Sequence, residues 1–218
     1  MLYSKNFRNL VAGVSLAAIT VMAQPVQAAG MDAVYNWDGL YAGLHLGAGF
    51  GDIKGLGALA GVNAKDKMSG VSGGVLAGWN FTSGNFLFGL EGDFAGTGIN
   101  GKINILGVAV SEDVRWTANL RARAGYLLSP GLLMFGAGGL AIADYNIKTN
   151  SIFAGNDSAT FTGWSLGGGI ESAAFDNIRL RLEYFYTDLG SKRMFSSVGG
   201  VKVSSNFHTI RAALIYHF

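Results

Sequence analysis

The sequence predicts an all-β protein, an eight-stranded antiparallel transmembrane β-barrel whose strands follow one another as an up-and-down meander. Three observations lead to this fold class. Apolar residues make up 50% of the chain and charged residues 14%, against about 25% charged in ordinary soluble domains. Apolar side chains recur with a period of two, which is the period of a strand. The predicted strands are separated by gaps that are alternately long and short, as in hairpins closed into a barrel.

The first 28 residues have the layout of a secretory signal peptide. Lys5 and Arg8 are followed by an uncharged, mostly apolar run at 10–23, and small residues precede a cleavage point after Ala28. A membrane-anchoring helix is the alternative, but a spanning helix needs about 20 apolar residues. We therefore expect a cleaved signal peptide at 1–28 and a single barrel domain at 29–218.

Charge and cysteine content exclude several functions. Removal of the two basic residues of the leader leaves a chain with 14 acidic residues and an equal number of basic ones, so nothing favours binding to nucleic acid. The chain has no cysteine, which excludes disulfides, thiolate metal sites and a cysteine nucleophile.

The alternation is clearest in 178–188, where apolar and aromatic residues occupy one face and arginine and glutamate much of the other. Aromatic residues lie near strand ends on the apolar face, as Trp116, Tyr126 and Tyr216 illustrate, and this is typical of a lipid-facing band with aromatic girdles. A sheet with a lipid-facing side must close, because open edges are costly in lipid. Eight strands are predicted, at 39–50, 70–81, 86–96, 113–127, 132–145, 160–173, 178–189 and 206–218.

The short gaps at 82–85, 128–131 and 174–177 predict periplasmic turns, and the long gaps at 51–69, 97–112, 146–159 and 190–205 predict external loops. Two long uncharged stretches, 68–90 and 124–143, resemble membrane helices in length. Glycines throughout both, and the Ser129-Pro130-Gly131 turn in the second, favour hairpins instead. Both faces of 132–145 are apolar or small, so its inward side is left open.

The charged face of each strand is expected to point into the barrel. Eight strands enclose a space just wide enough for side chains to fill, and buried charges need partners. We therefore predict an internal network that plugs the barrel. A narrow pore is the alternative, and an excess of inward arginine over carboxylate would make it favour anions. The predicted network consists of Glu91, Asp93, Arg115, Arg121, Arg123, Glu171, Arg179, Arg181, Glu183 and Arg211.

Catalytic and cofactor motifs are weak. Residues 70–74 match a G-x-S-x-G elbow and residues 136–141 a dinucleotide fingerprint, but neither lies between a strand and a helix. His45 and His217 are expected on the inward face of the first and last strands, as hydrogen-bonded residues rather than as a metal or haem site. Ser72 and His208 give no indication of proximity. We predict no enzyme, no cofactor and no metal.

Several segments resemble the small eight-stranded outer-membrane β-barrel proteins of the surface-antigen and opacity porin type. They are Trp37 to Gly43, Asn85 to Asp93, Leu120 to Tyr126 and Leu182 to Gly190. The end of the chain, Ala212 to Phe218, is similar to the assembly signal of such barrels, in which Tyr216 and Phe218 supply the aromatic pattern. The resemblance covers nearly all of 37–218.

This resemblance implies an integral protein of the bacterial outer membrane, inserted by the barrel-assembly machinery. The expected function is a non-enzymatic surface protein whose barrel anchors four extracellular loops, for envelope integrity or for contact with a host or small-molecule ligand. A small-solute porin and a haem-binding receptor are the alternatives. Lys192, Arg193 and Lys202 form a modest basic cluster that either contacts lipopolysaccharide phosphates or is simply solvated. Expected partners are outer-membrane lipid and lipopolysaccharide.

Overall fold

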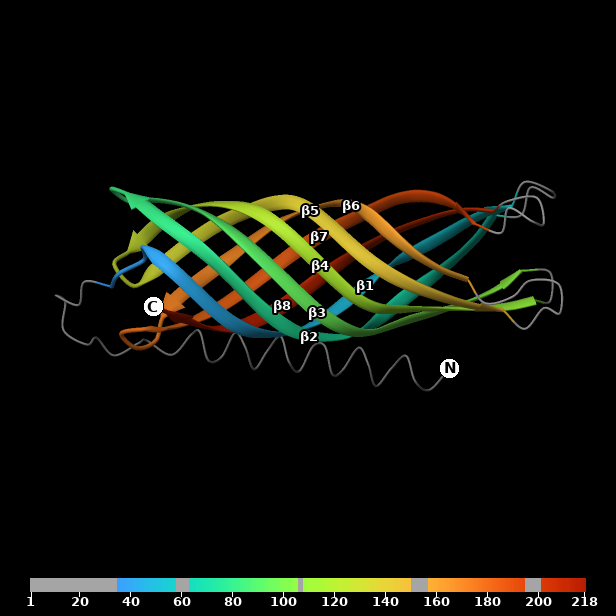
Figure 1. The fold of residues 1–218 in the computed structure, drawn as a ribbon, viewed down its shortest axis with the longest axis horizontal. Coiled ribbons are helices and arrows are strands. Elements are labelled where there is room, and N and C mark those ends of the chain that lie inside the picture. The colour runs from blue at the N-terminus through green and yellow to red at the C-terminus, as the bar shows by residue number, and fades with distance from the viewer. Residues whose placement is uncertain (1–34, 58–62, 106–107, 150–156, 195–200) are drawn as a thin grey trace.

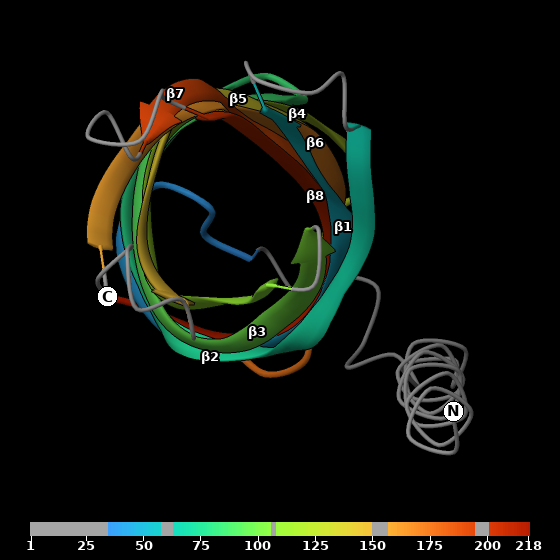
Figure 2. The same ribbon diagram turned by 90° about the vertical axis from the view of Figure 1, so that its right-hand side faces the viewer.

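The computed structural model describes residues 35–57, 63–105, 108–149, 157–194 and 201–218. These residues form one closed barrel in which each strand pairs antiparallel with its neighbours in sequence and β1 pairs with β8 (Figures 1 and 2). The predicted signal peptide at 1–28 lies outside the described residues. The strands are β1 Gly39–Gly57, β2 Asn63–Ser83, β3 Phe86–Ile105, β4 Val108–Ser129, β5 Leu132–Thr149, β6 Asp157–Ala173, β7 Ile178–Met194 and β8 Val201–His217.

Tight turns connect the strands at the end of the barrel where the C-terminus lies. The turn between β2 and β3 uses Gly84, whose φ of 61° is easily reached only without a side chain. The two stretches with the length of a membrane helix, 68–90 and 124–143, lie in the β2–β3 and β4–β5 hairpins, as their glycines predict. Within the described ranges, no helix is long and apolar enough to cross a membrane.

The strands are longer than the alternation predicts. They run for 17 to 22 residues, whereas about 9–11 residues of a tilted strand cross a bilayer. Much of the predicted external loops is therefore paired strand, as the pairing of Lys54 with Lys65 and of Lys102 with Ser111 illustrates. The expected loop boundaries were wrong because alternation records where a strand is exposed to lipid, while backbone pairing continues beyond the membrane.

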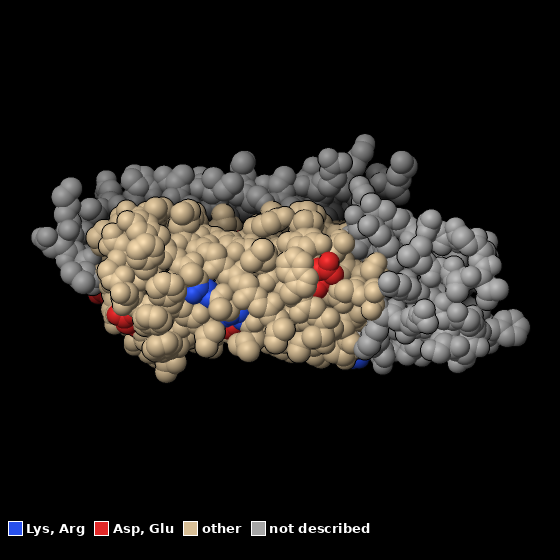
Figure 3. Space-filling view, turned by 90° about the horizontal axis from the view of Figure 1, so that it is seen from above, with Lys and Arg blue, Asp and Glu red and all other residues tan. Residues whose placement is uncertain are grey.

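The face of the barrel seen in Figure 3 carries few charged residues. Large apolar side chains such as Leu44, Leu90 and Leu140 are exposed along the strands. Aromatic side chains gather in two belts. One lies towards the tight turns and includes Trp79, Phe86 and Tyr216, and the other lies further along the strands and includes Phe94 and Trp164. An apolar band between two aromatic belts is the surface expected of a barrel embedded in lipid.

The inner surface of β5, left open by the sequence, carries its odd-numbered residues. Leu133, Phe135 and Ala137 are buried inside, while Met134 and Leu140 are exposed outside. Apolar and small side chains lie on both faces of this strand, so the pattern of polarity could not distinguish them.

Candidate functional site

Charged side chains from five strands meet inside the barrel. β3 contributes Glu91 and Asp93, and β7 contributes Arg181 and Glu183. These four side chains are at most 6% exposed. Glycines on the neighbouring inner face make room for them: a Cβ added at Gly169 would lie 2.8 Å from the Cα of Glu183. The other inward-facing charged side chains of this cluster are Arg121, Arg123, Glu171 and Arg211.

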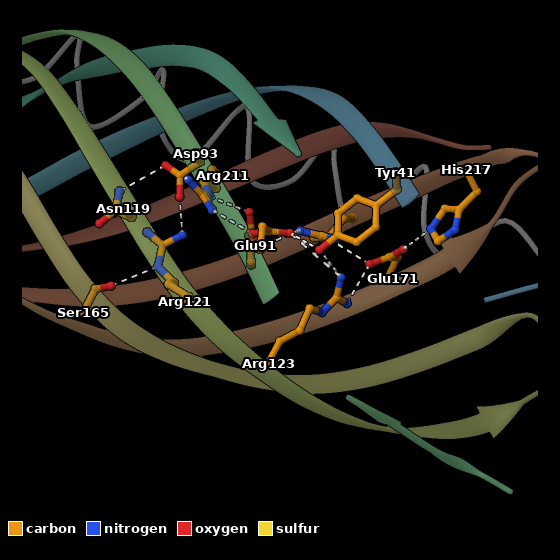
Figure 4. Close-up of polar contacts among 12 residues, drawn as sticks. Tyr41, Glu91, Asp93, Asn119, Arg121, Arg123, Ser165, Glu171, Arg211 and His217 are labelled. Carbon is orange, nitrogen blue, oxygen red and sulfur yellow. Dashed lines mark hydrogen bonds and ion pairs between the residues drawn. The ribbon is translucent and has the colours of Figure 1, made fainter. Parts of the chain in front are cut away.

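The half of the cluster nearer the tight turns, which we call the lower cluster, is centred on Glu171 and Glu91. Glu171 Oε2 accepts hydrogen bonds from Arg181 Nε at 2.8 Å and from Arg123 Nη2 at 2.9 Å. Glu91 Oε2 accepts hydrogen bonds from Arg181 Nη1 and, at 2.9 Å, from the hydroxyl of Tyr41 (Figure 4). Arg181 therefore joins two carboxylates that come from different strands.

The other half, the upper cluster, is centred on Asp93. Its Oδ1 accepts hydrogen bonds from Asn119 Nδ2 and Arg211 Nη1, both at 3.0 Å, and its Oδ2 accepts one from Arg121 Nη1 (Figure 4). Arg211 Nε in turn donates to Glu183. Each partner of Asp93 comes from another strand, so the cluster links β3, β4 and β8 across the lumen.

Aromatic rings lie against the guanidinium groups. The Cζ of Arg121 is 4.0 Å from the ring centroid of Phe185, and that of Arg123 is 4.3 Å from the ring of Phe135. The rings and ion pairs together fill the middle of the barrel. Buried charges of this kind are costly to desolvate and depend on their partners. Such an arrangement holds its side chains in place.

Arg115 does not belong to the network. The pairing of β4 with β5 shifts register between Val114 and Trp116, so Val114 points inward and Arg115 is exposed. The prediction for Arg115 was wrong because a bulge adds one residue to a strand and reverses the alternation beyond it.

Arg179 is buried, but at the mouth of the barrel near the tight turns rather than in the ion-pair cluster. Its guanidinium donates to the carbonyls of Phe175, Asp176 and Asn36 at 2.8–3.0 Å. Without Arg115 and Arg179, the described cluster holds four arginines and four carboxylates. The excess of arginine that would have made a pore favour anions is therefore absent from the described cluster.

The segment before β1 closes this mouth, a feature that the sequence did not predict. Residues 35–38 cross the opening of the barrel (Figure 2). Trp37 is buried against Leu87, Leu133 and Phe135, and its Nε1 donates to Pro130 O at 2.9 Å. The tryptophan that precedes the first alternating strand was the one sequence feature that could have indicated this closure. Alternation gives the inward or outward direction only of residues within a strand.

The histidines occupy different environments. His217 stacks on Tyr41 at 5.2 Å, and its Nε2 is 3.6 Å from Glu171 Oε1. His45 is buried further along the lumen. Neither ring nitrogen of His45 or of His217 has a hydrogen-bond partner, so both histidines differ from the hydrogen-bonded environment expected. His208 is on the outer face, where its Nδ1 is 2.6 Å from the hydroxyl of Tyr184.

The weak catalytic motifs lie within strands. Residues 70–74 are part of β2 and residues 136–141 part of β5, and neither is followed by a helix. Ser72 faces the lumen and His208 faces outward, so they are on opposite sides of the wall. Among the described residues, no three His, Cys, Asp or Glu side chains are grouped to hold a metal ion.

The aromatic residues of the predicted assembly signal lie at the end of the closing strand. Tyr216 and Phe218 are exposed, their rings are 5.3 Å apart, and Phe218 N donates to Leu40 O at 3.0 Å. Their outward position is compatible with recognition from outside the barrel, and their role in assembly stays a prediction.

An apolar outer band, aromatic belts and a closed meander of eight strands define an integral outer-membrane β-barrel protein. The chain belongs to the family described as the outer membrane protein beta-barrel domain, whose model matches residues 14–218.

Relatives in two genera carry outer-membrane names. The 31 kDa outer-membrane immunogenic protein of Brucella melitensis is 33% identical, over 94% of this chain and 93% of its own. The 22 kDa outer membrane protein of Rhizobium leguminosarum is 32% identical, over 77% and 69%. Among solved structures, the outer membrane protein OprG of Pseudomonas aeruginosa has the same fold, with a TM-score of 0.55, 13% identity and coverage of 86% and 100%.

Proposed function

We propose that the protein is a non-enzymatic, non-conducting surface protein whose plugged barrel anchors four extracellular loops, for envelope integrity or for contact with a host or small-molecule ligand. The observation that supports it most is the filled lumen. Arg123, Arg181 and Glu171 are almost completely buried and hydrogen-bonded to partners on other strands. Such a network keeps its side chains fixed across the lumen, because moving any one charged group leaves its partners unpaired.

The segment before β1 supports the same proposal from the periplasmic side. Trp37 fills the mouth, and the carbonyl of Asn36 accepts a hydrogen bond from Arg179 at 3.0 Å. A solute entering from the periplasm would meet this segment first and the lower cluster behind it. Two successive obstructions of the lumen, the segment before β1 and the lower cluster, favour a membrane anchor for the loops over a channel.

The paired extensions of the strands support a role in surface contact. The strands are much longer than the length that crosses a bilayer. Relatives are named outer-membrane immunogenic proteins, and we infer that this chain displays its loops at the cell surface. Contact with lipopolysaccharide, insertion by the barrel-assembly machinery and removal of residues 1–28 are further parts of this proposal.

Single-channel recording in planar bilayers tests the proposal. The refolded protein is expected to give no stable, reproducible opening steps, whereas regular steps of one size would establish the porin alternative. Far-ultraviolet circular dichroism and heat-shifted electrophoresis should accompany the recording. The absence of opening steps is then interpreted only for folded, inserted protein.

Neither enzymatic activity nor haem binding has a specific observation in its favour. The fold by itself does not decide the first question, since the outer membrane protease OmpT of Escherichia coli shares it, with a TM-score of 0.51 and 10% identity. For the second, spectroscopic titration of the refolded protein with haem is expected to give no saturable Soret shift, and a saturable shift would support a receptor.

A further inference from the structure

A small cavity lies in the lumen beyond the upper cluster, on the side away from the tight turns. Its volume is about 30 Å³, and a polar site of roughly 10–15 Å³ holds one water molecule. The cavity therefore has room for two waters or one monatomic ion. His45, Asp93, Arg121, Arg211 and Thr209 are among its lining residues.

Two of these residues have donors without a hydrogen-bond partner. His45 is 3% exposed and both of its ring nitrogens are unpaired. Arg211 Nη2 is also unpaired, and its nearest recorded carboxylate oxygen, Glu91 Oε1, is 3.8 Å away. A guanidinium nitrogen is a donor only, and a neutral imidazole has one N–H. Buried donors of this kind require an acceptor.

The free donors among the lining residues favour an anion as that acceptor. Arg121 and Arg211 line the cavity together with a single carboxylate, Asp93. Both oxygens of Asp93 already accept hydrogen bonds, from Arg121, Arg211 and Asn119. Among the lining residues arginine therefore exceeds carboxylate by one, while Arg211 Nε also donates to Glu183, which lies outside the lining. The donors that remain free belong to His45 and Arg211.

We propose that this cavity binds one halide-sized anion, held by Arg211 Nη2 and the N–H of His45. The ion completes the hydrogen bonding of the upper cluster. Larger anions such as gluconate do not fit the volume. The proposal concerns the upper lumen alone and holds whether or not the barrel conducts.

Thermal unfolding of the refolded protein in nonionic detergent tests the site. At constant sodium concentration and pH, replacing gluconate by chloride or bromide is expected to raise the unfolding temperature in a saturable way, by roughly 2–4 °C. His45→Phe should abolish the rise, and His45→Gln, which keeps a donor, should retain most of it. His208→Phe, on the outer face, is the matched control and should leave the rise unchanged.

Crystals grown in bromide give a readout that needs no variant. The proposal predicts an anomalous peak within hydrogen-bonding distance of Arg211 Nη2 and the His45 ring. Two water molecules and no peak would overturn it. So would equal unfolding temperatures in chloride and gluconate, or a halide response that persists in His45→Phe.

Discussion

The two halves of the lumen use the same residue types in different surroundings. In the lower cluster, Arg123, Arg181 and Glu171 are at most 3% exposed. Phe135 and Trp37 pack around and below them. The upper cluster borders a cavity, and nearby lining residues such as Ser72 and Thr209 are only partly buried. The stability lost when one partner of an ion pair is removed depends on the surroundings. The loss is large where water cannot solvate the remaining charge and smaller where water can.

Removing Arg181 should have the largest effect. Arg181→Leu leaves Glu91 and Glu171 with fewer cations in a dry site, and breaking such a buried pair costs about 3–5 kcal/mol. Urea unfolding in lipid vesicles and heat-shifted electrophoresis measure it. Arg115→Leu, on the outer face, is the matched control and should change little. Equal stability of Arg181→Leu and the wild type would contradict the importance of the lower cluster.

Trp37→Ala removes the side chain that closes the periplasmic mouth. Truncating a buried tryptophan costs about 3 kcal/mol, and the same unfolding assay measures the loss. Single-channel recording of this variant should still give no steps, because the lower cluster lies behind the mouth. Steps that appear only in Trp37→Ala would make the segment at 35–38, and not the ion pairs, the barrier to conduction.

Gly78→Ala tests whether the lower cluster has space to spare. A Cβ at Gly78 would overlap the hydroxyl end of Tyr41, which donates to Glu91. Overpacking of this kind costs roughly 1–3 kcal/mol. Gly96→Ala provides the control, since no atom outside its chain neighbours lies within 4 Å of a Cβ placed there. If both variants unfold at the same urea concentration, the lumen is less tightly packed than described.

Arg121→Leu should have the smallest effect, although it also removes an arginine from an ion pair. Asp93 keeps Arg211 and Asn119 as partners. Loss of the Arg121 side chain also enlarges the adjacent cavity, so that water can reach the carboxylate of the variant. We expect a loss of about 1–2 kcal/mol, measured beside Arg181→Leu in one urea series. A loss as large as that of Arg181→Leu would remove the distinction between the two halves.

The sequence allowed the strand order, the closed meander and most inward positions to be predicted. Alternation of polar and apolar side chains is imposed by the boundary between lipid and lumen, so it is strongest where the barrel crosses the membrane. Nine of the ten predicted network residues are buried, and the exception, Arg115, follows from a bulge. A bulge changes the register without changing the composition, which is why alternation did not reveal it.

Other features of the site could not be predicted from the alternation of polar and apolar residues. Which carboxylate pairs with which arginine depends on the stagger of the strands and on side chains that reach across the lumen, as Arg181 reaches Glu91 on β3. The closure by Trp37 depends on a segment outside any strand. The cavity at His45 depends on volumes left between side chains. None of these leaves a periodic signal in the sequence.

Cysteine accessibility shows whether the lumen is blocked across its middle, and the chain has no cysteine of its own to react. Ser72→Cys lies above the block, and Ala137→Cys lies at the level of the lower cluster, where Ala137 pairs with Arg123 on the neighbouring strand. In intact cells, a charged, membrane-impermeant thiol reagent should modify Ser72→Cys and leave Ala137→Cys unmodified, while both react after unfolding in urea. Modification of Ala137→Cys from outside at the rate of Ser72→Cys would contradict the account.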